Sequence, residues 1–201
     1  MIRVLIAEDQ TLVRGALRAL LDLEEDLEVV AEVGRGDAVV EAALEHRPDV
    51  ALLDIEMPGG DGIEAARALA AALPECRAVI LTTFGRPGFL RRAMEVGAAG
   101  FLVKDAPVAE LARGIRAVMA GERVIDRDLA AAALAIGATP LSTREADVLR
   151  AAADGATVAD IAGRLFLSEG TVRNYLSSAI GKAGARTRVE AARIAEEKGW
   201  L

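Results

Sequence analysis

Four residues that could carry chemistry stand directly after short apolar runs of the sequence. Glu8 and Asp9 follow the first run, Asp54 follows the third and Lys104 follows the fifth. If these runs are strands of a parallel sheet, their ends meet at the edge where such sheets bind ligands. A single acid at a strand end is most often a loop cap. Two or three converging carboxylates, however, supply the hard oxygen ligands that Mg²⁺ prefers and leave room for a phosphate.

The sequence favours a covalent phosphate over a bound nucleotide. Neither Gly-x-Gly-x-x-Gly nor Gly-x-x-x-x-Gly-Lys with a following Ser or Thr comes after the first run, so a nucleotide would lack its phosphate cradle. The remaining option is an acyl phosphate on one carboxylate, and Asp54 is the natural acceptor. The chain has one cysteine, Cys76, and one histidine, His46, which leave no disulfide framework and no Cys/His zinc site.

The elements that must position these residues alternate between strands and helices. Five strand-like runs cover residues 4–7, 27–33, 50–53, 79–81 and 101–103. A period of 3.6 residues predicts helices over 11–24, 37–46, 61–73, 87–96 and 107–120. Apolar strands linked by helices predict a doubly wound α/β fold with a five-stranded parallel sheet, flavodoxin-like, over residues 1–120.

The rest of the chain follows a different pattern. Residues 121–139 are rich in alanine and form a predicted linker with a helix over 126–136. Residues 140–201 show helical patterns only, which predict a small all-α domain. The predicted helices are 143–153, 158–165, 169–183 and 188–198, and the tight turn between the second and third is typical of a helix-turn-helix.

Charge is unevenly distributed along the chain. The net charge is -7, and residues 139–201 carry 9 basic against 8 acidic residues, which leaves 15 basic against 23 acidic residues for positions 1–138. Residues 164–193 hold a local basic patch, which fits a phosphate backbone or a solvated helix face. No apolar stretch reaches the roughly 18 residues of a membrane span, and carboxylates interrupt the first run before it could be a signal peptide. We therefore expect a cytoplasmic protein with no membrane partner.

The motifs of the first 120 residues resemble the receiver domain of two-component response regulators. They are the acid pair, the stretch Asp-Ile-Glu-Met-Pro-Gly-Gly-Asp-Gly at 54–62, Thr82 and Lys104, in this order across five strands. The resemblance implies that Asp54 accepts a phosphoryl group from a sensor histidine kinase, and that Thr82 and Lys104 bind the phosphoryl oxygens. It also implies a Mg²⁺ site at Asp9, Asp54 and the carbonyl of Glu56, which Glu8 helps to hold.

Aromatic residues near this site have two possible roles. The family couples its threonine to an aromatic residue on the fifth strand, usually tyrosine, and Phe101 stands there in this sequence. Phe101 would then switch by packing alone when the added phosphate charge pulls Thr82 inward; ordinary core packing is the alternative. Phe84 would shield the acyl phosphate from water, or simply pack within its loop.

The motifs of the helical domain resemble the LuxR-type DNA-binding domain. They are Leu-Ser-Thr-Arg-Glu at 141–145, Ile161-Ala162 and Leu-Ser-Glu-Gly-Thr-Val-Arg-Asn-Tyr at 167–175. Together with the receiver they resemble the NarL/FixJ subfamily over essentially the whole chain, and DesR-type regulators within it. The resemblance implies base contacts, which arginine and asparagine make well in a major groove, by Arg173, Asn174 and Ser177. It implies phosphate contacts by Thr171, Lys182, Arg186 and Arg188, although Thr171 could merely cap a helix and the two arginines could be solvated.

These features predict a transcription regulator that phosphorylation activates. A single helix-turn-helix module has a small contact area, so we expect phosphorylation to drive a homodimer onto the half-sites of a pseudo-palindromic promoter. Two alternatives use the same residues. One is an enzyme, a Mg²⁺-dependent aspartyl phosphotransferase or phosphatase, which we do not expect because short loops provide no cap over the site. The other is a regulator that works without phosphorylation.

Overall fold

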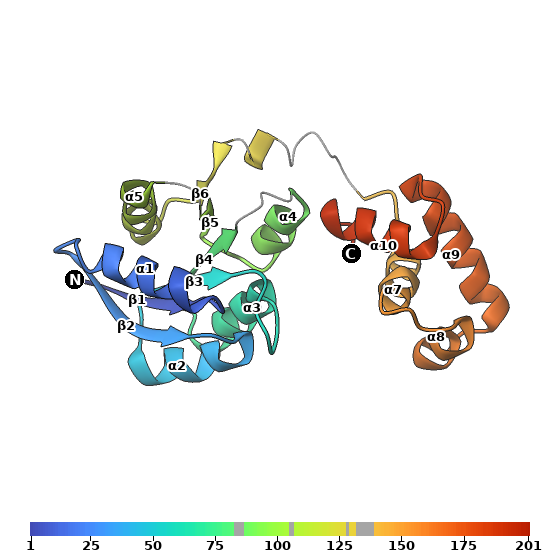
Figure 1. Ribbon diagram of the computed structural model, residues 1–201, viewed down its shortest axis with the longest axis horizontal. Helices are drawn as coiled ribbons and strands as arrows, with labels where there is room; N and C mark the ends of the chain where they lie inside the picture. The colour runs from blue at the N-terminus through green and yellow to red at the C-terminus, as the bar shows by residue number, and fades with distance from the viewer. Residues whose placement is uncertain (83–86, 105–106, 128, 132–138) are drawn as a thin grey trace. The chain divides into compact units, whose positions relative to one another are not determined.

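The computed structural model describes residues 1–82, 87–104, 107–127, 129–131 and 139–201, with only the backbone of Pro87 and Val108. The chain forms two compact units, and the last division between them falls between Ala130 and Ala131 (Figure 1). No helix in the described ranges is long and apolar enough to cross a membrane.

The first unit is built on a parallel sheet with the strand order β2-β1-β3-β4-β5-β6. The strands are β1 (Ile2–Ala7), β2 (Leu27–Val33), β3 (Val50–Asp54), β4 (Arg77–Thr82), β5 (Gly100–Val103) and β6 (Val124–Ile125). The connecting helices are α1 (Thr11–Leu21), α2 (Val39–His46) after a 3-10 turn η1 (Gly36–Ala38), α3 (Gly62–Ala72), α4 (Pro87–Glu95) and α5 (Val108–Met119). The predicted doubly wound α/β fold is confirmed.

The side chains of successive strand residues lie on opposite faces of this sheet. Val4, Ile6 and Leu52 lie in one buried cluster with Leu21 of α1 and Ile115 of α5. The intervening residues of each strand point to the opposite face, because side chains alternate along a strand. The sheet is thus buried on both faces, which is why its strands appear in the sequence as continuous apolar runs.

The sixth strand is the main departure from the predicted sheet. β6 lies within residues 121–139, where the sequence indicates only a linker. A strand of two residues shows no detectable hydrophobic period. It forms because Val124 N donates to the Ala99 carbonyl and Asp126 N donates to the Phe101 carbonyl, each at 3.2 Å. Of the predicted helix over 126–136, Arg127 and residues 129–131 are helical, and the rest lies outside the described residues.

The second unit consists of α7 (Thr143–Ala152), α8 (Val158–Leu165), α9 (Glu169–Ala183) and α10 (Arg188–Glu197). Each of these helices begins after a hydroxyl residue whose side chain accepts a hydrogen bond from the third helical N–H; these caps are Ser142, Thr157, Ser168 and Thr187. The interior is made of small and aliphatic residues, among them Val148, Leu149, Ile161, Val172 and Ala191. Local capping therefore fixes the helix starts that the sequence predicts.

Candidate functional site

The acids predicted at the strand ends do converge. β1 and β3 are paired neighbours whose last paired residues are Ala7 and Leu53, so Glu8 and Asp54 come next on adjacent strands. One carboxylate oxygen each from Glu8, Asp9 and Asp54 lie within 4.8 Å of one another. Glu8 and Asp54 are buried, whereas Asp9 is exposed. This position is the switch point of the strand order, where parallel α/β sheets bind ligands.

Lys104 completes the cluster from the end of β5. Its backbone N–H donates to the Thr82 carbonyl at 2.8 Å, which holds the two strand ends together. Its ammonium Nζ lies 2.5 Å from Glu8 Oε2 and 2.9 Å from Asp54 Oδ1. The Lys104 side chain is only 6% exposed, so this cation bridges two buried carboxylates at a place that water barely reaches.

Burial and pairing act in opposite directions on these charges. Burial raises the pKa of Asp54, although hydrogen bonds from Lys104 and from the N–H groups of Ile55 and Glu56 favour its ionised form. Burial likewise raises the pKa of Glu8, against the effect of Lys104. For Lys104, burial would lower the pKa, but its bonds to Glu8 and Asp54 together raise it. Lys104 is therefore charged, and the carboxylates are held close together in a region short of water.

Glu8 is held differently from Asp9 and Asp54. Its Oε1 accepts a hydrogen bond from the Gln10 N–H at 3.1 Å, and its Oε2 faces Lys104. Both oxygens of Glu8 thus have partners within the chain, while the Asp9 carboxylate faces solvent. Hard oxygens in this arrangement are the donor type that Mg²⁺ prefers, with open positions on the solvent side.

The other predicted residues of this site occupy the neighbouring strands. Thr82 ends β4 and is 5% exposed, and it pairs with Val103 in the sheet. Phe101 is fully buried, so its ring points into the molecule. Glu56 lies in the loop just after β3 with its side chain exposed. Phe84 lies outside the described residues.

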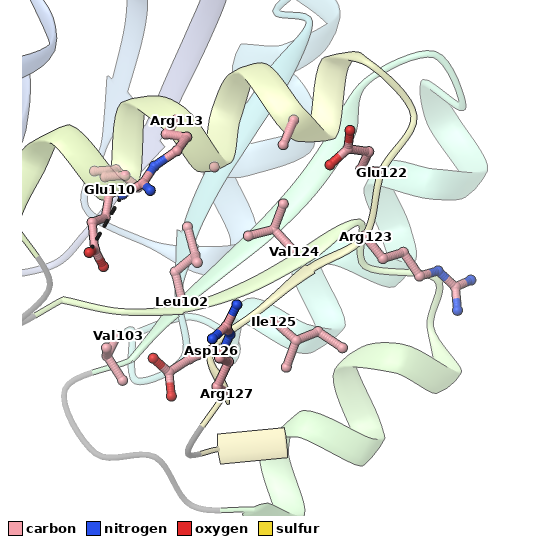
Figure 2. A pocket seen from close by; sticks show the side chains of 13 residues that line it. Leu102, Val103, Glu110, Arg113, Glu122, Arg123, Val124, Ile125, Asp126 and Arg127 are labelled. Atoms are coloured by element: carbon pink, nitrogen blue, oxygen red, sulfur yellow. Dashed lines mark ion pairs between the residues drawn. The ribbon is translucent and has the colours of Figure 1, made fainter. Parts of the chain in front are cut away.

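A larger hollow in the first unit is separate from this cluster. A groove of about 620 Å³ lies beside α5 and β6, and none of the clustered acids lines it. Figure 2 shows Glu110 and Arg113 on α5, paired at 3.5 Å, with Arg123 and Asp126 beside β6. Because acidic and basic side chains alternate around it, the groove offers no concentrated charge for a phosphate.

The helical unit presents the predicted base-contact residues on one side of α9. Val172 and Leu176 are buried in the domain core. Arg173, Asn174 and Ser177 are exposed, and residues four apart lie on the same helix face. Arg173 is paired with Glu169 at 2.5 Å on the helix surface.

The predicted phosphate-contact residues have varied surroundings. The Thr171 N–H donates to Ser168 Oγ at 3.1 Å, so Thr171 belongs to the first turn of α9. Arg186 is the most open, with its side chain 89% exposed. Arg188 donates to the Ala156 carbonyl at 2.8 Å and so connects α10 to the loop before α8.

Lys182 forms a contact that the sequence does not indicate. Its Nζ lies 2.6 Å from Oε2 of Glu145, which is buried on α7. The same oxygen accepts the Ser142 N–H at 2.6 Å, and Oε1 accepts Ser178 Oγ at 2.6 Å. Burial would raise the pKa of Glu145, but the bonds from Lys182, Ser178 and Ser142 together lower it to about 2. The Ser-x-x-Glu spacing is the sequence signal of this capping box, but it does not reveal the contact with α9.

A phosphoacceptor-type acidic cluster in a parallel α/β unit, followed by a helix-turn-helix unit, defines a response regulator. Family models agree: residues 4–116 match the response regulator receiver domain, and residues 139–195 match the bacterial regulatory proteins of the luxR family. The chain belongs to the NarL/FixJ subfamily of response regulators, which joins these two domains, and it is a phosphorylation-activated transcription regulator.

Relatives of the same architecture support this assignment over the full chain. The chain is 46% identical to the uncharacterized transcriptional regulatory protein YvfU of Bacillus subtilis and 45% identical to the transcriptional regulatory protein DesR of the same organism, each over all of both chains. It resembles the crystal structure of the response regulator ChrA of a heme-sensing two-component system with a TM-score of 0.60 and 34% identity, covering 100% of this chain and 98% of that one. A structure of two RcsB dimers bound to two parallel DNAs matches with a TM-score of 0.71 and 25% identity, covering 98% of each chain.

Proposed function

We propose that Asp54 is the phosphoacceptor and that a sensor histidine kinase is the donor. An Asp54 carboxylate oxygen attacks the phosphorus, the bond from phosphorus to the kinase's imidazole nitrogen breaks, and that imidazole leaves with its electron pair. The observation that carries this proposal is the 2.9 Å contact between Asp54 and the buried ammonium of Lys104. The cation lies beside the acceptor carboxylate, where it can also contact the phosphoryl oxygens that carry the negative charge during transfer, in a site that water screens poorly.

The donor set also fits a Mg²⁺ ion. We assign the ion to Asp9, Asp54 and the carbonyl of Glu56, with Glu8 holding Lys104 and the turn at Gln10. When bound, Mg²⁺ would neutralise the charge of the phosphoryl oxygens. Exposure of Asp9 next to two buried acids leaves the solvent side open for the ion and for the phosphate.

The switch follows from the contacts of Lys104 and Thr82. A phosphoryl group brings about -1.5 to -2 charge and three strong acceptors to Asp54. Lys104 then exchanges its carboxylate contact for a phosphoryl oxygen, and the Thr82 hydroxyl turns towards another. Because the Lys104 N–H is bonded to the Thr82 carbonyl, the two strand ends move together. Phe101, packed behind them without a hydroxyl, follows by repacking.

We propose a second copy of the chain as the partner of the α1 and α5 face. An apolar groove of about 300 Å³ lies between these helices, and Lys104 is among its lining residues. Leu12 at its rim is 89% exposed. A change at Lys104 can therefore alter an apolar surface directly, and burial of exposed leucines supplies the free energy that a single surface ion pair does not.

The DNA contacts are assigned from the exposed face of α9. Arg173, Asn174 and Ser177 would read base edges, once Arg173 exchanges Glu169 for a base. Thr171 and Lys182 lie at opposite ends of the helix, separated by about 16 Å at a rise of 1.5 Å per residue. This length exceeds the width of the major groove, about 12 Å, so the two ends of the helix reach the phosphate backbones of different DNA strands. Arg186 and Arg188 extend the contact along the backbone near Lys182.

The first test is phosphorylation with a mass readout. The full chain is incubated with Mg²⁺ and either acetyl phosphate or beryllofluoride, and light scattering gives its molar mass beside Asp54→Asn. We expect the mass to double in the wild type alone. A wild type that is neither modified nor changed in mass would refute Asp54 as the switch.

The chain is proposed to act in the cytoplasm, where its DNA partner lies, and to have no catalytic activity beyond hydrolysis of its own acyl phosphate. Turnover of added phosphomonoesters that is lost in Asp54→Asn would contradict the second point. That assay needs only Mg²⁺ and a chromogenic phosphate ester.

A further inference from the structure

The loop between β3 and α3, residues 55–61, shapes the proposed acceptor site. Its first two N–H groups, from Ile55 and Glu56, favour the ionised form of the Asp54 carboxyl and so act to lower its pKa. Its far end is closed by the Gly62 N–H, which donates to the Ile55 carbonyl at 3.0 Å. The path of this loop therefore orients the acceptor carboxylate and also sets the position of the Glu56 carbonyl.

A second loop clamps this one from the outside. Gly36, in the turn between β2 and α2, donates its N–H to the Pro58 carbonyl at 3.0 Å. A Cβ atom on Gly36 would lie 2.1 Å from the Gly60 carbonyl oxygen and 2.8 Å from the Gly60 carbonyl carbon. Both neighbours are backbone atoms, so neither can rotate away as the end of a side chain can.

Glycine is required at position 36 because a side chain would not fit there, and not because of the backbone conformation. Its φ is not in the left-handed range, whereas Gly59 and Gly60 of the facing loop have φ of 81° and 137°. The turn also holds Asp37, whose carboxylate would be 2.6 Å from a Cβ on Gly59. At Gly36 the two loops thus meet backbone to backbone, while beside it the Asp37 side chain faces Gly59.

The far end of the 55–61 loop cannot absorb a displacement freely. Asp61 accepts the Glu64 N–H at 2.7 Å, as the N-cap of α3, and accepts Arg92 of α4 at 2.9 Å. With that end fixed, any push at Gly60 is transmitted back through Pro58 towards Glu56 and Asp54. A tightly packed interior transmits such strain instead of dissipating it.

We propose that Gly36 is a positioning residue of the acceptor site: its bare backbone seats the 55–61 loop so that the Glu56 carbonyl and the Asp54 carboxylate can bind Mg²⁺ and accept phosphate. This inference rests on the proposed function of Asp54. It assigns a role to a residue that neither touches the acceptor nor belongs to its loop.

The test compares Gly36→Ala with Gly34→Ala in the full chain. The nearest neighbour of a Cβ on Gly34 would be the end of the flexible Arg14 side chain, at 3.1 Å, and its backbone contact with the Glu8 carbonyl oxygen would be an ordinary 3.8 Å, so this control makes the same change in the same turn at little steric cost. Mn²⁺ replaces Mg²⁺ as the probe, and electron paramagnetic resonance gives its dissociation constant. Mass spectrometry follows modification of Asp54 by acetyl phosphate at saturating Mg²⁺.

We expect Gly36→Ala to weaken Mn²⁺ binding about tenfold, the scale on which outer-shell changes act, and to slow modification of Asp54. We expect Gly34→Ala to stay within about twofold of the wild type on both measures. Equal Mn²⁺ binding and equal rates in Gly36→Ala and the wild type would overturn the role of Gly36 alone. A wild type that neither binds Mn²⁺ nor is modified would instead refute the proposed function.

Two further measurements separate positioning from stability. Val50→Ala removes methyl groups at a fully buried site at the opposite end of β3, so it should lower stability and leave Mn²⁺ binding unchanged. If it weakens Mn²⁺ binding as Gly36→Ala does, the effect is one of stability and the inference fails. In the wild type, Mg²⁺ should slow hydrogen exchange of the Gly36 amide, since coupling between two sites is reciprocal. Unchanged exchange would overturn the inference even if Gly36→Ala does not fold.

Discussion

Replacement of Glu145 by glutamine is expected to remove a pH-dependent part of the stability of the DNA-binding domain. The folded domain lowers the pKa of Glu145 from 4.5 to about 2. At 1.36 kcal/mol per pKa unit, this difference corresponds to a stabilisation of up to about 3 kcal/mol at neutral pH. Because the folded pKa is the lower one, the stabilisation is complete above pH 4.5 and is lost as the pH falls towards 2.

The structure provides a specific reporter for this measurement. The chain has one tryptophan, and Trp200 packs against the core of the helical unit. Tryptophan fluorescence in a urea titration of the full chain therefore follows the unfolding of this unit. At pH 7 we expect Glu145→Gln to lower the free energy of unfolding by up to about 3 kcal/mol, and at pH 2.5 we expect the gap from the wild type to narrow to about 1 kcal/mol.

Other acids of the domain also have lowered pKa values, so only the difference between variant and wild type is informative. In both proteins, acidification also removes the stabilisation of the folded domain that comes from the lowered pKa values of Asp154, Asp160 and Glu190. Glu169→Gln is the matched control, because Glu169 forms an exposed pair with Arg173, and such pairs contribute about 0.5 kcal/mol. A gap between Glu145→Gln and the wild type that stays constant from pH 7 to pH 2.5 would refute the reasoning.

Three further outcomes are expected. Lys104→Ala leaves Glu8 and Asp54 buried without their cation and should cost on the order of 3 kcal/mol, part of which Mg²⁺ should restore in urea unfolding followed by circular dichroism; no effect of Mg²⁺ would contradict the proposed donor set. Burial raises the pKa of Cys76 to about 12, so at pH 8 a disulfide reagent should label this thiol only as the receiver unfolds, and rapid labelling of native protein would contradict its burial. Phe166 is 95% exposed and has a left-handed φ of 53°, so Phe166→Gly should raise the tryptophan-detected stability by about 1 kcal/mol; a lower midpoint in urea would show that the ring has a stabilising contact.

Much of the architecture follows from local features of the sequence. Apolar runs with turn residues between them predict strands that are buried on both faces, and the fold class is confirmed. The meeting of Glu8, Asp54 and Lys104 follows as well, because parallel strands end at the same edge. Helix starts are equally local, since Ser142 and Ser168 cap helices through bonds to residues three positions ahead.

The sequence by itself determined the two domain types, the strand ends that carry the acidic residues of the site, and the exposed face of α9. It could do so because hydrophobic period and capping chemistry act over a few residues. Only the tertiary structure decided three other features: the sixth strand, the contact of Glu145 with Lys182, and the backbone contact of Gly36 with Gly60. The two contacts join segments that are distant in the chain, and the sixth strand is too short to show a hydrophobic period. Such contacts depend on how packed elements bring backbones and side chains together, and no local pattern records that.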